Sequence, residues 1–429
     1  MPHRSGRIVV FAVFLFALIV YSSFQFGDTE ERITRLKAYG PHRPNGGISN
    51  PGGGAKQGPS IDKSNTERTP GAGPIQDVRN STLGFQKVFL INLPERTDKL
   101  DAFSLASSLS DFTYDLIPGI HGAEIPDKSL PATQGLPDKQ SIRNNQVGCW
   151  RAHLNFARRV VNDRLTSALV IEDDADWSLL LKDQLALFAQ GAQYILSPKR
   201  DSKTASSPPL PLPQTPAPHS PYGDTWDLLW LGHCGTQITP NDTYRFVVEN
   251  DITVPPTSRL INFGPSNPDL KKEGLSPSSR VVYTASSGLC TYAYALSNKG
   301  ASKVLQYQNS QIDEFHPIDL GLAKMCKEED NFHCIGVFPQ IIDSHKKRGK
   351  SQGDSDIART TEMEEGEIRE KGYTLNVVHS VRCNLDRLVQ GEKMQEGQEQ
   401  EWSQYGADEG PKIEPGGART REMERENDV

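Results

Sequence analysis

A short apolar run at residues 168–171 ends directly in three carboxylates, Glu172, Asp173 and Asp174. Four consecutive apolar residues are typical of a strand buried on both faces, as in a parallel sheet covered by helices. Adjacent carboxylates repel one another and lose hydration there unless a cation or hydrogen-bond donors compensate. Because ligands of open α/β sheets bind at the carboxyl ends of strands, the run predicts a polar site at this point.

Strands and helices are expected to alternate through the surrounding region. The apolar runs expected to form strands are 87–93, 168–171, 227–231 and 292–296. The segments with helical character are 95–109, 147–162 and 179–193, and another helix is expected from Lys299. This alternation predicts an α/β fold with a mostly parallel sheet.

The N-terminus holds the one apolar segment long enough to cross a membrane. Residues 8–26 form a 19-residue segment, near the roughly 20 residues that a transmembrane helix needs. Arg4 and Arg7 precede it and acidic residues follow it. We therefore expect residues 1–7 in the cytoplasm and the rest in the lumen or outside the cell. A cleaved signal peptide is the alternative, although no A-x-A-like cleavage site follows the apolar core.

Composition divides the rest of the chain. Residues 27–82, rich in Gly, Pro, Ser and Asn, predict a flexible stem. Residues 198–222 read as a Pro/Ser-rich surface insertion, with a polyproline-type ligand as the alternative. The polar tail, 391–429, is expected to be disordered and holds 11 acidic and 5 basic residues, most of the net charge of −7. What remains is one domain, 83–390. The charge balance of the chain disfavours a basic nucleic-acid binder.

Asp174-Ala175-Asp176 is a D-x-D sequence, whose period-two spacing would aim both carboxylates to one side of a strand. Carboxylates suit Mg²⁺ or Mn²⁺, which bind through one or two of them plus substrate phosphates. A solvated acidic turn that caps the following helix is the alternative.

The segment 168–177 (ALVIEDDADW) resembles glycosyltransferase family 25, which includes lipooligosaccharide and procollagen galactosyltransferases. The similarity spans about residues 86–357. Its other matching elements, in order, are Ile91-Asn92-Leu93 with Arg96, residues 117–122, residues 148–153, residues 226–232, residues 292–296 with Gly300-Ala301, Pro317-Ile318-Asp319 and residues 353–357. Ala152 departs from the Ser that the family often has before His153, and the 198–222 insertion and the tail are extra.

The resemblance implies a GT-A-like nucleotide-sugar-binding domain in a Golgi or ER type II membrane enzyme. Such an enzyme transfers a galactose-like sugar from a nucleotide-sugar donor to a glycan or glycoprotein acceptor, with inversion. A divalent ion, Mn²⁺ or Mg²⁺, neutralises the charge on the diphosphate leaving group, and the acceptor hydroxyl needs a general base.

These roles extend to individual residues. The expected catalytic residues are Asp319 and His153, the donor-binding residues are Asn92, Arg96, Glu172 and Asp173, and the metal ligands are Asp174, Asp176 and His345. A helix N-cap is the alternative for Asp319, and a hydrogen-bonded core histidine is the alternative for His153. The basic run 346–348 could attract a diphosphate or form a solvated turn.

Six cysteines permit disulfides in a lumenal protein, and Cys326 with Cys334 is the best local pair. Zinc at the His-Cys pairs 233–234 and 333–334 is discounted, because no C-x-x-C spacing supports it. Asn80 and Asn241 begin glycosylation sequons, as expected for lumenal exposure.

Two other functions stay open. The chain could be a catalytically inert glycan-binding relative or an assembly factor of the secretory pathway, with a purely structural acidic run. A metal-dependent hydrolase is also possible, because clustered carboxylates serve phosphate chemistry, but no second ligand set of a two-metal site is evident.

Overall fold

A computed structural model describes residues 74–131, 140–197, 204–206, 219–239, 244–256, 260, 267–311, 315–350, 354, 356 and 368–392. The expected anchor at 8–26, residues 27–73 of the expected stem and residues 393–429 of the expected tail lie outside these ranges. Among the described helices, none combines the length and the apolar character needed to cross a bilayer.

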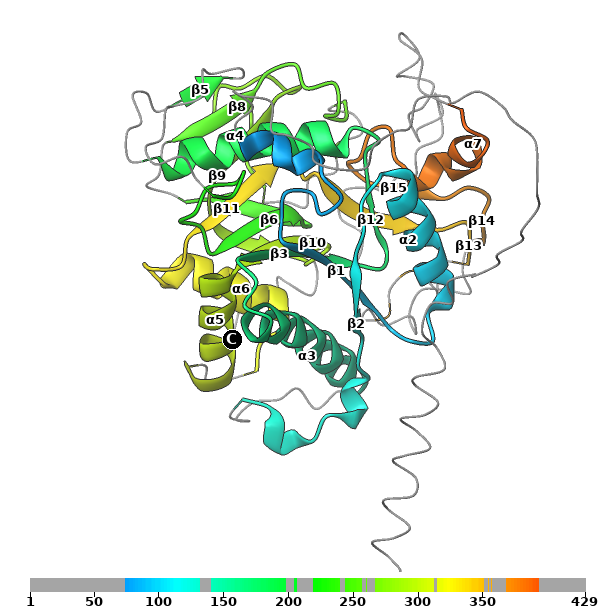
Figure 1. The fold of residues 1–429 in the computed structure, drawn as a ribbon, viewed down its shortest axis with the longest axis vertical. Coiled ribbons are helices and arrows are strands. Elements are labelled where there is room, and N and C mark those ends of the chain that lie inside the picture. Colours follow the sequence, from blue (N-terminus) through cyan, green and yellow to red (C-terminus); the bar gives the residue numbers. More distant parts are fainter. Residues whose placement is uncertain are drawn as a thin grey trace, which may run out of the picture. The chain divides into compact units, whose positions relative to one another are not determined.

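The centre of the fold is one large sheet, whose main path runs β2-β1-β3-β10-β6-β11-β9-β8-β5 (Figure 1). These strands are β1 Lys87–Asn92, β2 Asp115–Pro118, β3 Ser167–Glu172, β5 Thr204–Ser206, β6 Leu228–Gly232, β8 Arg245–Val248, β9 Arg280–Leu289, β10 Ala293–Ser297 and β11 Cys334–Phe338. Only β10 and β9 run against the others on this path. The sheet is therefore largely parallel, as predicted, and mixed at these two strands.

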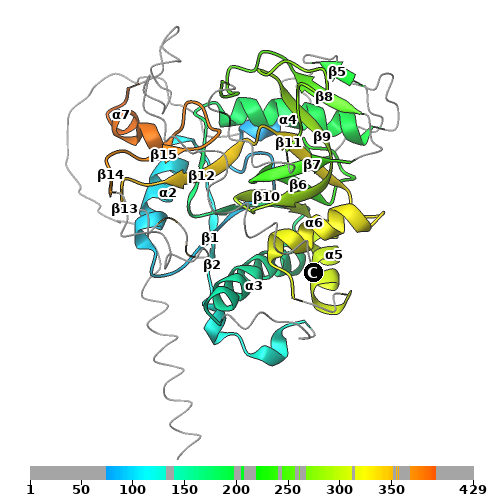
Figure 2. The same ribbon diagram turned by 180° about the vertical axis from the view of Figure 1, so that it is seen from behind.

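Further strands extend the sheet beside its main path. The short strands are β4 Ala175–Trp177, β7 Gly235–Ile238, β12 Ile342–Lys346 and β15 Tyr373–Thr374. β12 pairs with β4, β6 and β15, whereas β7 pairs with β9 (Figure 2). A separate ribbon consists of β13 Gly349–Lys350 and β14 Ile368–Arg369. Through β12, the segment after residue 370 reaches the region of the acidic run.

Helices cover both faces of the sheet (Figure 1). One face carries α2 Thr97–Leu109, α4 Leu181–Leu196 and the 3₁₀ helix η1 Pro74–Arg79, and the other carries α3 Gln140–Asn162, α5 Asn298–Gln306 and α6 Ile318–Glu328. Shorter elements are η2 Gly122–Glu124, η3 Asp127–Ser129, η5 Tyr307–Gln311, η7 Arg382–Asn384 and α7 Leu385–Val389. Strand β3 is buried from both sides, because Leu169 and Ile171 join one apolar cluster while Ala168 and Val170 join the other.

Helix α3 begins at Gln140, earlier than the expected start at residue 147. It packs closely on the chain that follows β2, and a Cβ atom at Gly148 would lie 2.2 Å from the carbonyl oxygen of Ile120. A side chain at residue 148 would therefore push the helix away. This approach sets the position of the helix face that carries His153.

Two segments expected outside the packed domain belong to it. Val78, in the expected stem, is fully buried. Tyr222, in the expected insertion, is also fully buried, and its ring stacks on Phe85 with 4.5 Å between centroids. Its hydroxyl donates a 2.6 Å hydrogen bond to the carbonyl of Leu83. Composition placed both segments outside the core because abundant Pro, Ser and Gly conceal single buried side chains.

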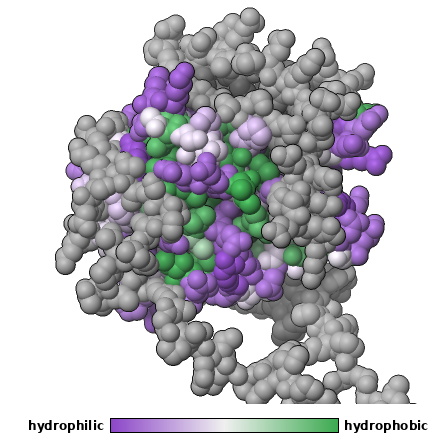
Figure 3. All heavy atoms as spheres, turned by 90° about the horizontal axis from the view of Figure 1, so that it is seen from above, coloured by the Kyte–Doolittle hydropathy of each residue, from purple (hydrophilic) through white to green (hydrophobic). Residues whose placement is uncertain are grey.

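Most exposed large hydrophobic side chains come from separate segments. They are Leu105 and Leu109, both on α2, and Leu116, Ile252, Leu320, Ile368 and Val389. On the face seen from above, hydrophobic residues lie among hydrophilic ones (Figure 3). Scattered exposed apolar residues are ordinary on protein surfaces.

Candidate functional site

The carboxyl ends of β1 and β3 lie side by side. The strands are parallel, with Ile91 opposite Glu172. Asn92 ends β1, and its Nδ2 donates a 2.9 Å hydrogen bond to Oδ2 of Asp173. Asn92 and the acidic run, predicted from separate motifs, are therefore together at one edge of the sheet.

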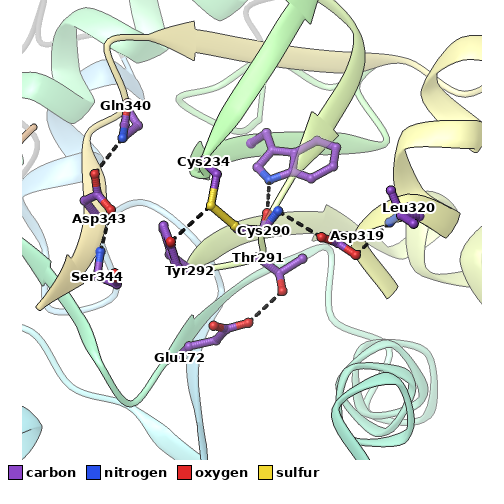
Figure 4. The surroundings of a disulfide bond; sticks show 11 residues. Glu172, Cys234, Cys290, Thr291, Tyr292, Asp319, Leu320, Gln340, Asp343 and Ser344 are labelled. Atoms are coloured by element: carbon purple, nitrogen blue, oxygen red, sulfur yellow. Dashed lines mark hydrogen bonds between the residues drawn. A yellow bond between two sulfur atoms is a disulfide. The ribbon is translucent and has the colours of Figure 1, made fainter. Parts of the chain in front are cut away.

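The connection between β9 and β10 crosses this edge (Figure 4). Because β10 is antiparallel to β3, its first residues lie beside the last residues of β3. Oγ1 of Thr291 donates a 2.6 Å hydrogen bond to Oε1 of Glu172. Cys290 forms a disulfide with Cys234, 56 residues earlier, which fixes the connection to the end of β6.

Asp319 lies in the first turn of α6 and faces this connection (Figure 4). Its Oδ2 accepts a 3.0 Å hydrogen bond from the backbone N–H of Cys290, and its Oδ1 accepts one of 2.9 Å from Leu320. Burial, together with the charge of Glu172, raises the pKa of Asp319 against these hydrogen bonds. The candidate base thus lies near the acidic run.

His153 contacts the carboxyl end of β3 from the face of the sheet that α3 covers. It is 1% exposed, and its Nε2 lies 3.2 Å from Oε1 of Glu172. Its Nδ1 lies 3.1 Å from the hydroxyl of Tyr294. Burial tends to raise the pKa of Glu172, but hydrogen bonds from His153 and Thr291 hold it below its ordinary value. His153 therefore supports an ionised Glu172.

Asp173 has two buried cations as neighbours. Nζ of Lys99 lies 3.0 Å from Oδ1 of Asp173 and 2.6 Å from Oδ2 of Asp356. Nη2 of Arg382 donates a 2.7 Å hydrogen bond to the backbone carbonyl of Asp173. Burial raises the pKa of Asp173, whereas Lys99 and Asn92 lower it. Part of the charge of the acidic run is therefore compensated by the protein itself.

Arg96, an expected donor ligand, is held by carboxylates. Its Nε lies 3.0 Å from Oδ1 of Asp98, and its Nη1 contacts Asp356. The hydrogen bonds that Arg96 donates to Asp98 and Asp356 raise its pKa despite its partial burial. Because Asp356 also contacts Lys99, Arg96 is linked to Asp173 of the acidic run through Asp356 and Lys99.

Asp174 differs from every other carboxylate of the run. It lies in the turn between β3 and β4, is half-buried, and its carboxylate accepts no hydrogen bond from the described residues. Burial raises its pKa to about 6, against the charges of Lys99 and Lys346. A carboxylate in this state suits a hard divalent cation, whereas Glu172 and Asp173 beside it already accept hydrogen bonds from protein groups.

Asp176 is fully buried and fully hydrogen-bonded. Its Oδ2 accepts from the hydroxyls of Thr374, at 2.5 Å, and Ser380, and its Oδ1 accepts from the N–H groups of Trp177 and Arg382. β4 begins at residue 175, so Asp176 lies within the strand and Asp174 in the turn before it, and a common side for the two carboxylates stays a prediction.

His345 of β12 lies beside Asp176. Its Nδ1 is 2.8 Å from Oγ1 of Thr374, 3.8 Å from Oδ2 of Asp176 and 4.0 Å from Sγ of Cys383. Burial lowers the pKa of His345 to about 4, so the ring is neutral near pH 7, as a metal ligand must be. Its backbone N–H, rather than its ring, contacts Asp174. Metal binding by Asp176 and His345 stays a prediction.

Asn80 is exposed, and its Oδ1 accepts a 2.8 Å hydrogen bond from the N–H of Thr82. The other sequon, at Asn241, lies outside the described residues. The Cys326–Cys334 disulfide is present as predicted, whereas Cys234–Cys290 was not predicted. Cys149 and Cys383 are free thiols.

Several site residues had no sequence signal of their own. Lys99 lies within a polar helix, Thr291 in a connection, and Arg382 far along the chain. Asp356 belongs to segment 353–357, which is part of the resemblance to glycosyltransferase family 25, and only this resemblance pointed to it. These four reach the site only through contacts between distant parts of the chain.

Comparison with known proteins supports a glycosyltransferase of the family 25 type. No family model matches the chain. It is 26% identical over 127 residues to procollagen galactosyltransferase 1 of Danio rerio, covering 28% of this chain and 21% of the relative. It is 26% identical over 111 residues to human procollagen galactosyltransferase 2, covering 24% and 18%. A glycosyltransferase 25 family member of Anopheles gambiae is 25% identical over 108 residues, covering 23% and 18%. The chain thus spans about a fifth of the length of these curated relatives.

Proposed function

We propose that the chain is a glycosyltransferase that moves a galactose-like sugar from a nucleotide-sugar donor to a glycan or glycoprotein acceptor. The observation that carries the proposal is Asp174 at the carboxyl end of β3, a half-buried carboxylate to which none of the described residues donates a hydrogen bond. Such a group at a ligand-binding edge suits a divalent cation with a diphosphate. The galactosyltransferase relatives support the same chemistry.

Asp174 would hold Mn²⁺ or Mg²⁺ together with the diphosphate of the donor. When bound, the ion neutralises the charge that develops on the leaving diphosphate. Lys346 is half-buried and its charge acts on Asp174, so its ammonium group would contact the same phosphates. Next to Asp174, Asn92 and Lys99 contact the carboxylate of Asp173 and hold its position.

Asp319 would act as the general base of an inverting, single-displacement reaction. Each of its oxygens accepts one N–H, which leaves a lone pair on each for the acceptor hydroxyl. The acceptor oxygen forms its bond to the sugar while the bond to the diphosphate breaks, and the hydroxyl proton passes to Asp319. The raised pKa of Asp319 suits proton transfer.

We also propose a single-pass type II membrane protein with its catalytic domain in the Golgi or ER lumen. The apolar segment 8–26, preceded by Arg4 and Arg7, supports this topology. Two disulfides and an exposed sequon at Asn80 suit an oxidising, glycosylating compartment.

The full chain, incubated with Mn²⁺ and a panel of nucleotide sugars, tests the activity. We expect slow hydrolysis or transfer of one donor, lost in Asp174→Asn and kept in the matched control Asp386→Asn, which changes an exposed carboxylate on α7. Loss of Mn²⁺-assisted chemistry corresponds to several kcal/mol, or roughly a hundredfold or more in rate. Equal activity in both variants contradicts the proposal.

A catalytically inert glycan-binding relative is the second candidate. Lys99 and Arg382 already compensate part of the acidic run, so the run could be stable without a metal. This candidate predicts no turnover with any nucleotide-sugar donor and no change in the melting temperature on addition of Mn²⁺. The chain would still bind to a glycan array.

A further inference from the structure

A thiol, an imidazole and a carboxylate converge below the acidic run. Cys149 and His153 are four residues apart on α3 and therefore share one face of the helix. That face meets Glu172 at the end of β3. Sγ of Cys149, a ring nitrogen of His153 and a carboxylate oxygen of Glu172 all lie within 4.8 Å of one another.

We propose that Cys149, His153 and Glu172 bind a soft divalent metal ion such as Zn²⁺. Sulfur, imidazole nitrogen and carboxylate oxygen are the three ligand types of protein zinc sites, and three protein ligands with an open fourth position are a common arrangement. Tetrahedral ligand atoms lie roughly 3.3–3.8 Å apart for the usual bond lengths, so small side-chain rotations close the set. This position differs from Asp174, where an all-oxygen environment suits a hard ion.

Neighbouring groups orient the imidazole for this role. Nδ1 of His153 faces the hydroxyl of the buried Tyr294 at 3.1 Å, while Nε2 faces Oε1 of Glu172 at 3.2 Å. With the proton on Nδ1 and donated to the hydroxyl of Tyr294, the lone pair of Nε2 would bind the ion in place of the hydrogen bond that Nε2 makes with Glu172. Such an outer hydrogen bond fixes the tautomer of most metal-binding histidines.

Charge and access also fit a cation. The charges of Glu172 and Asp319 act on Cys149, and negative charges at this point attract a divalent ion. On binding, the thiol proton leaves to solvent and the thiolate bonds to the metal. The Glu172 side chain is 19% exposed, whereas that of His153 is 1% exposed, so solvent reaches the carboxylate of this group but not the imidazole.

Occupancy would withdraw His153 and Glu172 from contact with a bound sugar. If the proposed transferase activity is correct, on which this consequence alone rests, the ion inhibits it. Metal binding itself can be measured without any activity.

Cobalt(II) is a suitable probe, because thiolate ligation gives a charge-transfer absorption that oxygen and nitrogen ligation do not. The six cysteines form two disulfides and the free thiols Cys149 and Cys383, so the absorption has two possible sources. Cys383→Ser is the matched control, since Cys383 lies in the separate group with Asp176 and His345.

In the full, disulfide-intact chain we expect the thiolate absorption in the parent and in Cys383→Ser, its loss in Cys149→Ser, and its displacement by Zn²⁺. Glu172→Gln should keep the band but weaken cobalt binding roughly tenfold or more. This second variant decides the matter if Cys149→Ser fails to fold. Absence of the band in the folded parent, its persistence in Cys149→Ser, or unchanged affinity in Glu172→Gln would overturn the proposal.

Discussion

The backbone N–H of Cys290 donates a 3.0 Å hydrogen bond to Oδ2 of Asp319 (Figure 4). The same cysteine is bonded to Cys234, and the next residue, Thr291, donates to Glu172. One disulfide therefore holds the segment that contacts both a candidate base and Glu172, the first residue of the acidic run.

The Cys234–Cys290 disulfide should matter for the site, beyond its effect on stability. We expect Cys234→Ser/Cys290→Ser to lower both the melting temperature and the turnover of the proposed transferase. Cys326→Ser/Cys334→Ser, which opens a disulfide of sequence separation 8 between α6 and β11, should affect mainly stability. Each loss is on the order of 2–4 kcal/mol. Thermal unfolding and kinetics on the same preparations test this, and equal kinetic defects would refute the positioning role.

Asp174→Asn should be at least as stable as the parent at pH 8 without metal. Burial raises the pKa of Asp174 to about 6, so its folded-state stability contribution is present at low pH and is lost as the pH rises through 6. The amide removes this cost. Mn²⁺ should raise the melting temperature of the parent at pH 8, do so less at pH 5, where Asp174 is protonated, and leave the variant unchanged. An equal Mn²⁺ shift in both proteins would exclude Asp174 as a ligand.

Asp319→Asn should lower turnover about a hundredfold or more, because the amide cannot accept the acceptor proton. Its stability should fall by about 1–3 kcal/mol, since the amide nitrogen cannot accept one of the two backbone N–H groups. An active but destabilised variant would show that Asp319 only caps α6. Steady-state kinetics and denaturant unfolding separate the two outcomes.

Tyr222→Ala should destabilise the fold by about 3–5 kcal/mol, because it empties a fully buried site against Phe85. Tyr222→Phe keeps the ring and loses the hydrogen bond to Leu83, so it should cost about 1–2 kcal/mol. Urea unfolding measures both. A neutral Tyr222→Ala would mean that the segment before residue 223 is dispensable after all.

Asn80 should carry an N-linked glycan if the domain is lumenal. Endoglycosidase should shift the mobility of the parent expressed in cells, and Asn80→Gln should remove part of that shift, with the rest assigned by Asn241→Gln. In sealed vesicles, a C-terminal tag should resist protease. Digestion of the tag would reverse the proposed topology.

Local sequence patterns were sufficient to predict β1 and β3, the two strands whose carboxyl ends form the candidate site. The apolar run before Glu172 predicted a buried strand, and β3 covers 167–172 with its odd and even residues in different apolar clusters. The apolar run 87–93 predicted β1 in the same way, whereas Asn92 was singled out by the family resemblance. Both strand predictions depend on residues within a few positions of one another, where chain periodicity determines which side chains are buried.

Only the tertiary structure decided how the acidic residues differ from one another. Asp173 has Lys99 beside it, Asp176 has donors from residues 374–382, and Asp174 has none among the described residues. The partner of Cys234 and the burial of Tyr222 were decided in the same way. In each case the contact joins residues tens to hundreds of positions apart, and a hydrogen bond or desolvation energy depends on distance in space, which local sequence periodicity does not specify.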